Sequence, residues 1–478
     1  MKTIFIQTLQ IAIRQGYIKV LTIIQLLLFT LVAINAMISH KTNLKSFEKA
    51  KTTVRQDWLN QGPQNPHSSA HYGYYIFQPV EVMQYLDNGV RSFAGSILRL
   101  EAHAQNEAAF SPAQDKTELS RFGGMSFAWM LQVLMPLFII ILCFNSINTD
   151  KANQNLKLIS VQGINNNKYL WGKILALYSI VLSLSVAGLI LQLITYAIFA
   201  KNAPGIIFGN TFTWLLIYAV YLFILTTISV LISAWVKQDR SSLLIQLASW
   251  VILIIVMPKI TAEVGVALFP LEHKSVFSKA LKEDRDKGID GHNPADTRSK
   301  QFMDSVIAYY KIDTNKVKDI NEVLPVNVDG LVMQADEDYA NIVYDKHFKR
   351  IRNTIENQNS VSKYASFLNP YFAIRNISMN VCQSGFNNHL NLLSEAEIYR
   401  RTLIKTLNNK MAYGGSKTGN WDWKVDANYW ESIPDFTYPS NTLSQTLIQS
   451  KTELIALFVW LLLTIVITNY SANFLKVI

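Results

Sequence analysis

Hydrophobic residues in this 478-residue chain are concentrated in six blocks, with ordinary polar sequence between them. A helix of about 20 predominantly apolar residues crosses the hydrocarbon core of a bilayer, and each block is long enough to do so. Long polar stretches follow the first and the fifth block. The pattern predicts an all-α polytopic membrane protein with six transmembrane helices and two mainly helical segments outside the membrane. The expected spans are 17–38, 126–147, 173–200, 212–236, 242–269 and 454–470.

The two polar segments, 39–125 and 270–450, also have helical composition over much of their length. We expect the first span to continue as a helix to Leu59, and residues 98–109 to form a further helix. In the second segment, runs that are charged and poor in glycine predict helices. These runs are 271–287, 331–364 and 390–410.

Residues 1–16 combine apolar residues with Lys2 and Arg14, which is typical of an amphipathic helix lying along a membrane surface. The apolar residues are Ile4, Phe5, Leu9, Ile11, Ala12 and Ile13. A plain basic lead-in to the first span is the alternative. Within the spans, Pro136 and Pro258 predict local breaks, because proline has no N–H to donate to the helix.

Basic residues are unevenly placed in the short connections. They are Lys2, Arg14, Lys151, Lys157, Lys168, Lys237 and Arg240. Because short cytoplasmic connections are enriched in lysine and arginine, we expect both termini and the connection 148–172 to be cytoplasmic. The polar segments would then lie outside. The net charge of +10 does not indicate nucleic-acid binding, because the basic residues are interleaved with acids and form no basic run.

The connection 148–172 is polar, but apolar residues recur in it at roughly helical spacing. They are Leu156, Ile159, Ile164, Leu170 and Trp171. This pattern predicts a short amphipathic helix on the membrane surface, interrupted at Gly163. The alternative is a surface loop that only joins two spans.

The order of residues in this connection resembles the cytoplasmic coupling helix of type-2 ABC transporter permeases. The matching residues are Asp150, Leu156, Ile159, Ser160, Gly163, Gly172 and Lys173. Stretches in both polar segments resemble a bacterial subset with large extracytoplasmic domains after the first and fifth spans. These stretches are 65–73, 101–103, 290–294 and 324–330.

The resemblance implies the permease subunit of an ATP-driven transporter, an exporter of unassigned substrate, in the bacterial cytoplasmic (inner) membrane. The implied partners are a separate ABC ATP-binding subunit, which would bind ATP and Mg, and a second permease copy or sister permease. The implied ATPase-coupling residues are Asp150, Leu156, Ile159, Ser160, Gly163 and Ile164. The alternatives are a secondary transporter and a membrane-anchored metal-binding or sensing protein.

We expect no enzymatic activity and no cofactor in the chain itself. A phosphate-binding loop needs the spacing Gly-x-x-x-x-Gly-Lys-Ser/Thr. The glycine-rich stretch 414–419 does not have this spacing and is interpreted as a loop. ATP hydrolysis is therefore expected in the partner subunit.

Two groups of residues have side chains suited to binding or gating. Imidazole and carboxylate groups bind zinc and copper, so His67, His71, Glu101 and His103 form a candidate metal site in the first polar segment. Hydrogen-bonded structural histidines are the alternative. Near the outer end of the fifth span, Pro258, Lys259 and Glu263 form a candidate gate, since ionisable residues at membrane depth are often functional. Alternatively, Lys259 and Glu263 reach the interface and pair with each other.

Overall fold

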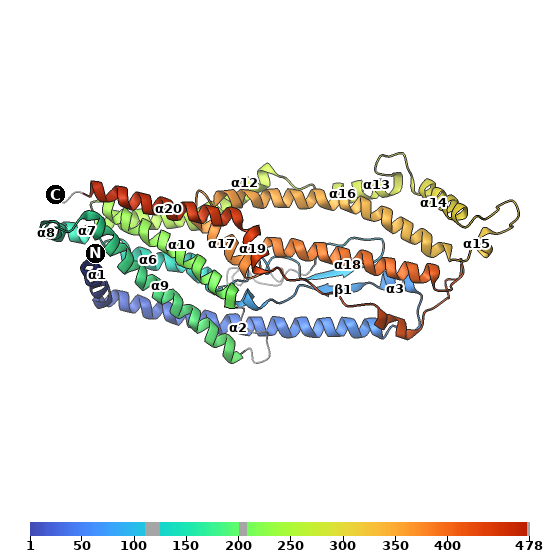
Figure 1. The fold of residues 1–478 in the computed structure, drawn as a ribbon, viewed down its shortest axis with the longest axis horizontal. Coiled ribbons are helices and arrows are strands. Elements are labelled where there is room, and N and C mark those ends of the chain that lie inside the picture. The colour runs from blue at the N-terminus through green and yellow to red at the C-terminus, as the bar shows by residue number, and fades with distance from the viewer. Residues whose placement is uncertain (110–124, 200–207, 476–478) are drawn as a thin grey trace.

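The computed structural model describes residues 1–109, 125–199 and 208–475. Residues 110–124 of the first polar segment, the expected end of the third span at residue 200 and Lys476 lie outside the described residues. The protein is elongated, with long apolar helices in one half and a polar domain in the other (Figure 1). We use "polar domain" for residues 41–109 and 270–442.

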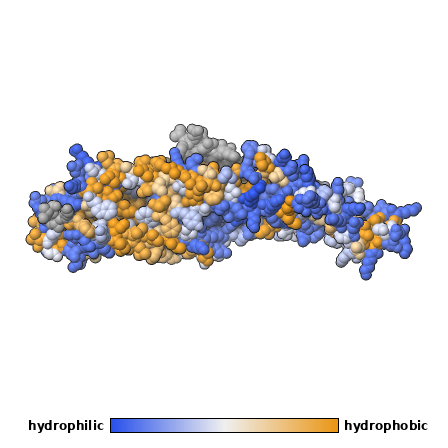
Figure 2. Space-filling view, turned by 90° about the horizontal axis from the view of Figure 1, so that it is seen from above, coloured by the Kyte–Doolittle hydropathy of each residue, from blue (hydrophilic) through white to orange (hydrophobic). Residues whose placement is uncertain are grey.

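The expected fold class is confirmed: the protein is mostly helical, and six long apolar helices are candidate membrane spans. Figure 2 shows hydrophobic residues covering this half of the molecule, while hydrophilic residues cover the polar domain. The helical segments of the spans are α2 (Gly16–Leu59), α5 (Phe127–Trp129), η2 (Met130–Leu134), α6 (Met135–Cys143), α9 (Asn166–Phe199), α10 (Phe208–Trp235), α11 (Asp239–Trp250), η3 (Val251–Val256), α12 (Met257–Leu268) and α20 (Lys451–Phe474).

Close packing between the first three spans depends on a glycine in α9. A Cβ atom at Gly188 would lie 2.6 Å from the Phe29 ring and 2.8 Å from the Phe127 ring. These two rings meet edge to face, with their centroids 5.1 Å apart. A larger residue at Gly188 would therefore separate the spans.

The fifth span lies at the outside of the bundle. In its most apolar stretch 6% of the residues are buried, against 67% in the second span. Since apolar side chains cover most of this exposed surface, the fifth span is suited to contact lipid or another membrane helix.

At both prolines where the sequence predicts a break, the span contains a π-helical turn, in which each N–H bonds to the carbonyl five residues earlier. η2 ends just before Pro136, and η3 ends just before Pro258. In η3, the last such bond runs from the Met257 N–H to the carbonyl of Ile252. Proline cannot make the next bond, so the Leu253 carbonyl accepts one from Asn369 Nδ2 instead, at 2.7 Å.

Two long helices connect the spans to the polar domain. α2 has 44 residues and is about 66 Å long at 1.5 Å per residue, roughly twice the thickness of a hydrocarbon core. Its apolar first half lies among the spans, and its charged second half lies in the polar domain (Figure 1). α16 (Val328–Ala365) runs back from the far tip toward the spans and ends near α20, where Trp460 Nε1 donates to the Ser366 carbonyl at 3.1 Å.

The polar domain, though mainly helical as expected, contains a small antiparallel sheet, which corrects the helix expected over 98–109. β1 (Tyr74–Phe77) pairs with β2 (Ile97–Leu100), and Tyr74 lies opposite Leu100. Alternate residues of β2, Leu98 and Leu100, are buried, as the two-residue period of a strand requires. The other elements of the polar domain are α3 (Pro66–Tyr72), η1 (Val82–Tyr85), α13 (Lys274–Lys287), α14 (Ala295–Tyr309), α15 (Ile320–Val323), α17 (Pro370–Val381), α18 (Phe386–Tyr413) and η4 (Ala427–Ser432). α19 (Leu443–Gln449) follows the domain and leads into α20.

The core of the polar domain is built around two tryptophans. Trp58 at the end of α2 packs edge to face on Trp430 of η4, with the ring centroids 5.7 Å apart. Both side chains are at most 1% exposed, and Trp430 Nε1 donates to the Gly62 carbonyl at 2.8 Å. Segments before the second span and after the fifth therefore form one core.

Replacing Trp430 by alanine should destabilise the polar domain by about 3–5 kcal/mol, because the substitution removes a buried aromatic side chain and leaves a cavity. Unfolding of the detergent-solubilised chain, followed by tryptophan fluorescence, measures the effect. Trp421→Ala is the matched control, since Trp421 is 52% exposed. Equal stability of the two variants would contradict this description of the core.

Candidate functional site

Both described chain ends and the 148–172 connection lie at the end of the span bundle opposite the polar domain (Figure 1). Asn166 Nδ2, at the start of α9, donates to the carbonyls of Ala472 and Leu475 at 3.1 and 3.2 Å. We call this region the terminal end. It also contains α1 (Lys2–Arg14), α7 (Asn148–Ala152) and α8 (Asn155–Val161).

The N-terminal helix packs against the third span. Ile4, Thr8 and Ala12, on one face of α1, are buried. A Cβ atom at Gly172 would lie 2.9 Å from the Ile4 side chain. Gly172 therefore allows α1 to lie close to the start of α9.

An ion pair fixes the 148–172 connection to the third span. Lys173 Nζ lies 2.6 Å from Asp150 Oδ2, and the Tyr169 hydroxyl donates to the same oxygen at 2.6 Å. The Lys173 side chain is 10% exposed, so water screens this pair less than a surface pair. The structure thus brings together the acidic and basic ends of the motif noted in the sequence.

The apolar face of the connection is divided differently from the expected arrangement. Leu156 is 2% exposed and belongs to the core of the spans, and Ile159 and Ile164 pack against that core. Leu158 and Val161 are instead 62% and 86% exposed. Leu156 therefore anchors the connection to its own chain, whereas Ile159 and Ile164 are only partly buried, and their role in ATPase coupling stays a prediction.

Gly163 ends α8 as expected. Its φ of +79° is unfavourable for residues with a side chain, and the Ile164 N–H bonds back to the Ile159 carbonyl at 3.3 Å. This bond is typical of a glycine-terminated helix. Ser160 is partly buried, and its hydroxyl has no hydrogen-bond partner among the described residues.

The candidate gate residues follow the π-helical turn η3. Pro258 begins the first turn of α12, and Lys259 and Glu263 are both exposed. No ion pair joins Lys259 to Glu263 in the described structure, so the pairing considered in the sequence is not seen. Both side chains lie on the open surface of the fifth span.

In the polar domain, α3 presents two histidines on one face. Asn65 caps the helix by accepting a hydrogen bond from the His67 backbone N–H, and Pro66 occupies the first turn, where its missing N–H costs little. His67 and His71 are four residues apart and so share a helical face. Their Nε2 atoms are 3.0 Å apart.

A third histidine, His103, joins this pair from the tight turn that follows β2. The turn is closed by a bridge between Glu101 and Ala104, and His103 has a left-handed φ of 60°. Its ring centroid lies 5.6 Å from that of His67 and 5.2 Å from that of His71. One ring nitrogen from each histidine lies within 4.8 Å of the other two.

Glu101, the fourth residue expected in this site, is directed elsewhere. Its carboxylate pairs with Arg99 at 2.9 Å and accepts a hydrogen bond from Asn106 at 2.8 Å. The carboxylates that contact the histidine group instead belong to Glu337 and Asp336 of α16. His103 Nδ1 lies 3.1 Å from Glu337 Oε1 and 3.7 Å from Asp336 Oδ2.

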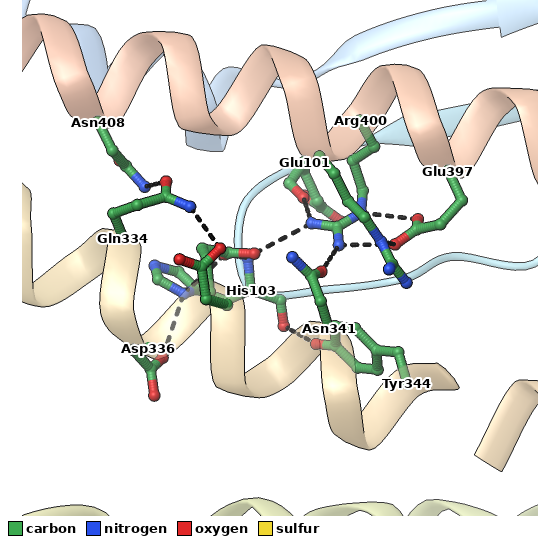
Figure 3. Close-up of polar contacts among 12 residues, drawn as sticks. Glu101, His103, Gln334, Asp336, Asn341, Tyr344, Glu397, Arg400 and Asn408 are labelled. Carbon is green, nitrogen blue, oxygen red and sulfur yellow. Dashed lines mark hydrogen bonds and ion pairs between the residues drawn. The ribbon is translucent and has the colours of Figure 1, made fainter. Parts of the chain in front are cut away.

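Glu337 belongs to a buried charge network, part of which is drawn in Figure 3. Its second oxygen accepts a hydrogen bond from Arg400 Nη1 at 3.1 Å, and the two side chains are 2% and 1% exposed. Arg400 also makes two bonds of 2.8 Å to Glu397, one to each carboxylate oxygen. The network holds α16 and α18 together next to the His103 turn.

Two further side chains fix the His103 backbone. Arg285 of α13 donates to its carbonyl at 2.9 Å, and the Tyr344 hydroxyl donates to the same oxygen at 2.5 Å. The His103 N–H donates to Glu337. Both backbone polar groups of His103 are therefore bonded, which holds its left-handed conformation in place.

The environment shifts the pKa values of His67, His71 and Glu337. Burial, assisted by the neighbouring His71 and His103, lowers the pKa of His67 to about 4, and burial also lowers the pKa of His71. Burial alone would raise the pKa of Glu337, but the His103 hydrogen bond and the Arg400 charge outweigh it and lower the pKa to about 2. At pH 7, neutral His67 and His71 rings thus lie near an ionised carboxylate.

Comparison with protein families assigns part of the polar domain. Residues 275–439, about a third of the chain, match the family described as "Domain of unknown function (DUF3526)". The chain carries a DUF3526 domain. A search of curated proteins found no match.

The residues of the charge network belong to the DUF3526 domain, whereas the three histidines of the candidate metal site do not. Glu337 and Arg400 lie within the matched residues, whereas His67, His71 and His103 lie in the segment between the first two spans. Glu337 was missed in the sequence because 234 positions separate it from His103. An acidic residue in the charged run 331–364 carries no local signal that distinguishes it from its neighbours.

Arg400→Met should destabilise the DUF3526 domain by about 3–5 kcal/mol, because the substitution leaves buried carboxylates without their cationic partner. Arg350→Met is the matched control. Arg350 pairs with Glu272, and the two side chains are 51% and 44% exposed; such pairs contribute up to about 1 kcal/mol. Thermal unfolding of the two variants compares them, and an Arg400→Met protein as stable as the control would rule out a structural role for the network.

Proposed function

We propose that this chain is the membrane permease subunit of an ATP-driven ABC transporter, in which a separate ATPase subunit hydrolyses ATP. The proposal rests on the way in which α8 is attached to the spans at the terminal end. There, a short helix is fixed to the spans through its buried face and exposes two apolar side chains, Leu158 and Val161. A helix anchored in this way can transmit force, because it cannot move without moving the spans.

The docking surface for the ATPase is formed by Leu158 and Val161. Exposed apolar side chains on a polar segment are typical of interfaces when they occur together. The Asp150–Lys173 pair and the buried Leu156 hold α8 against the bundle. Motion of a docked ATPase would therefore reach the spans as rigid-body movement.

The basic residues of the short connections favour a cytoplasmic terminal end and a polar domain on the outer side of the membrane. The resemblance to ABC permeases implies that this membrane is the inner membrane of a bacterial cell. α2 and α16 extend from the spans into the polar domain. They would carry motion of the spans to the outer surface, where the polar domain would receive, gate or hand on the substrate.

A second permease copy or a sister permease would cover the fifth span. This span is nearly unburied within the chain, and it exposes Lys259 and Glu263. Charged groups facing lipid are costly, so contact with another subunit or with the interfacial headgroups would stabilise them. Pro258 and the η3 turn lie at the same surface and remain the candidate gate.

Replacing both Leu158 and Val161 by aspartate should weaken binding of the ATPase without changing the amount of protein in the membrane. Burying one such side chain contributes roughly 1.5–3 kcal/mol, which corresponds to about a ten- to hundredfold change in an association constant. The measurement is co-purification of an ATP-binding subunit with the tagged chain in mild detergent, together with ATP turnover.

Tyr309→Asp is the control, because Tyr309 is 79% exposed and lies in the polar domain. It should retain the ATPase at wild-type stoichiometry. A Leu158→Asp and Val161→Asp protein that also retains the ATPase would refute the proposed docking surface. A wild-type chain that transports without any ATPase would favour the secondary-transporter alternative.

A further inference from the structure

We propose that His67, His71 and His103 bind a zinc or divalent copper ion at the surface of the polar domain, with Glu337 and Asn408 orienting two of the ligands. The proposal does not depend on an ATPase, since it concerns only atoms of this chain. It rests on the positions of the ring nitrogens and on the groups behind them.

The ligand geometry is close to that of a tetrahedral site. With metal–nitrogen bonds of 2.0–2.1 Å, two ligands of one ion are separated by roughly 3.4 Å. The Nε2 atoms of His67 and His71 are 3.0 Å apart. Small side-chain rotations would bring the His103 nitrogen, which lies within 4.8 Å, to the same ion.

The groups behind the ligands are those expected of a metal site, where a ligating histidine usually donates its second N–H to a carboxylate or carbonyl oxygen. His103 has Glu337 on its Nδ1, which leaves its Nε2 for an ion. His67 Nδ1 and Asn408 Oδ1 are both buried without a hydrogen-bond partner in the described chain, and the two side chains interact. A small rotation of the His67 ring would pair them.

The ligand types select the ion. Imidazole nitrogens suit zinc and divalent copper, whereas magnesium and calcium prefer oxygen ligands. No thiolate is available to favour monovalent copper, because Cys143 and Cys382 are buried in the core of the spans. The group is thus a three-nitrogen site for a divalent ion.

The site is open on one side, which suits an ion that exchanges. His71 is exposed, and His103 borders a cleft of about 700 Å³ that is also lined by Arg285 and Tyr344. Three protein ligands leave a fourth position of a tetrahedral ion for water or an incoming ligand. The polar domain could therefore accept or release the ion.

The test uses the full-length chain purified in mild detergent, stripped of metal with a chelator and titrated with Zn²⁺ or Cu²⁺ alone. Competition with a chromophoric chelator gives the affinity, and elemental analysis gives the stoichiometry. We expect one ion per chain and no comparable binding of Mg²⁺ or Ca²⁺. The electron paramagnetic resonance spectrum of the copper form should show coupling to three nitrogens.

His71→Ala is the most informative variant, because His71 is exposed and its ring contacts His67 and His103. It should lower the affinity at least tenfold and reduce the nitrogen coupling to two. Glu337→Gln should keep one ion per chain but bind it about 10–100-fold more weakly. His292→Ala, at another exposed histidine of the polar domain, is the matched control and should bind as the wild type does.

Melting temperatures measured without metal show whether each variant is folded. Loss of the ion from a folded His71→Ala protein, with retention by His292→Ala, supports the site. Wild-type protein that binds neither ion, or equal affinity in wild type and His71→Ala, overturns it.

Discussion

Inside a bilayer, every backbone N–H and C=O must be hydrogen-bonded within the protein, because no water is available to them. Six long apolar helices meet this requirement over most of their length. At Pro258, where the helix lacks a backbone donor, the chain forms a π-helical turn. The Leu253 carbonyl, which is left without a backbone partner, accepts a hydrogen bond from Asn369 outside the span. The requirement divides the molecule into an apolar middle and two polar ends, and each end carries a different candidate site.

The two ends are mechanically connected. At the terminal end, the Asp150–Lys173 pair and the buried Leu156 join the 148–172 connection to the spans. In the other direction, α2 passes from the spans into the polar domain without interruption, and the Trp58–Trp430 contact fastens its far end. A movement applied at one end would therefore reach the other through packed helices. The proposed permease function uses this connection.

The sequence predicted what depends on local pattern. Six spans followed from hydropathy, and the imidazole side chains of His67, His71 and His103 marked them as candidate metal ligands, although the helix α3 that carries the first two was not expected. The strand at Leu98 and Leu100 could not be predicted from the sequence, because four residues in a mixed segment show too little periodicity to distinguish a strand from a helix. The sequence also did not show which face of α8 is buried. Leu156 and Leu158 are the same residue type, and only the position of the spans in the folded chain makes one buried and the other exposed. Glu337 and Asn408 could not be linked to the histidines, because folding alone brings such distant positions together.

In the proposed transporter, the 148–172 connection and the polar domain lie on opposite sides of the membrane. Single cysteines at Asn165 and Lys300, both exposed positions, test this directly in intact cells with a membrane-impermeant thiol reagent. Cys143 and Cys382 are buried, so they should contribute little background. We expect labelling of Lys300→Cys in intact cells, and of Asn165→Cys only after the membrane is permeabilised. Equal labelling of both in intact cells would contradict the six-span topology and the docking proposed at the terminal end.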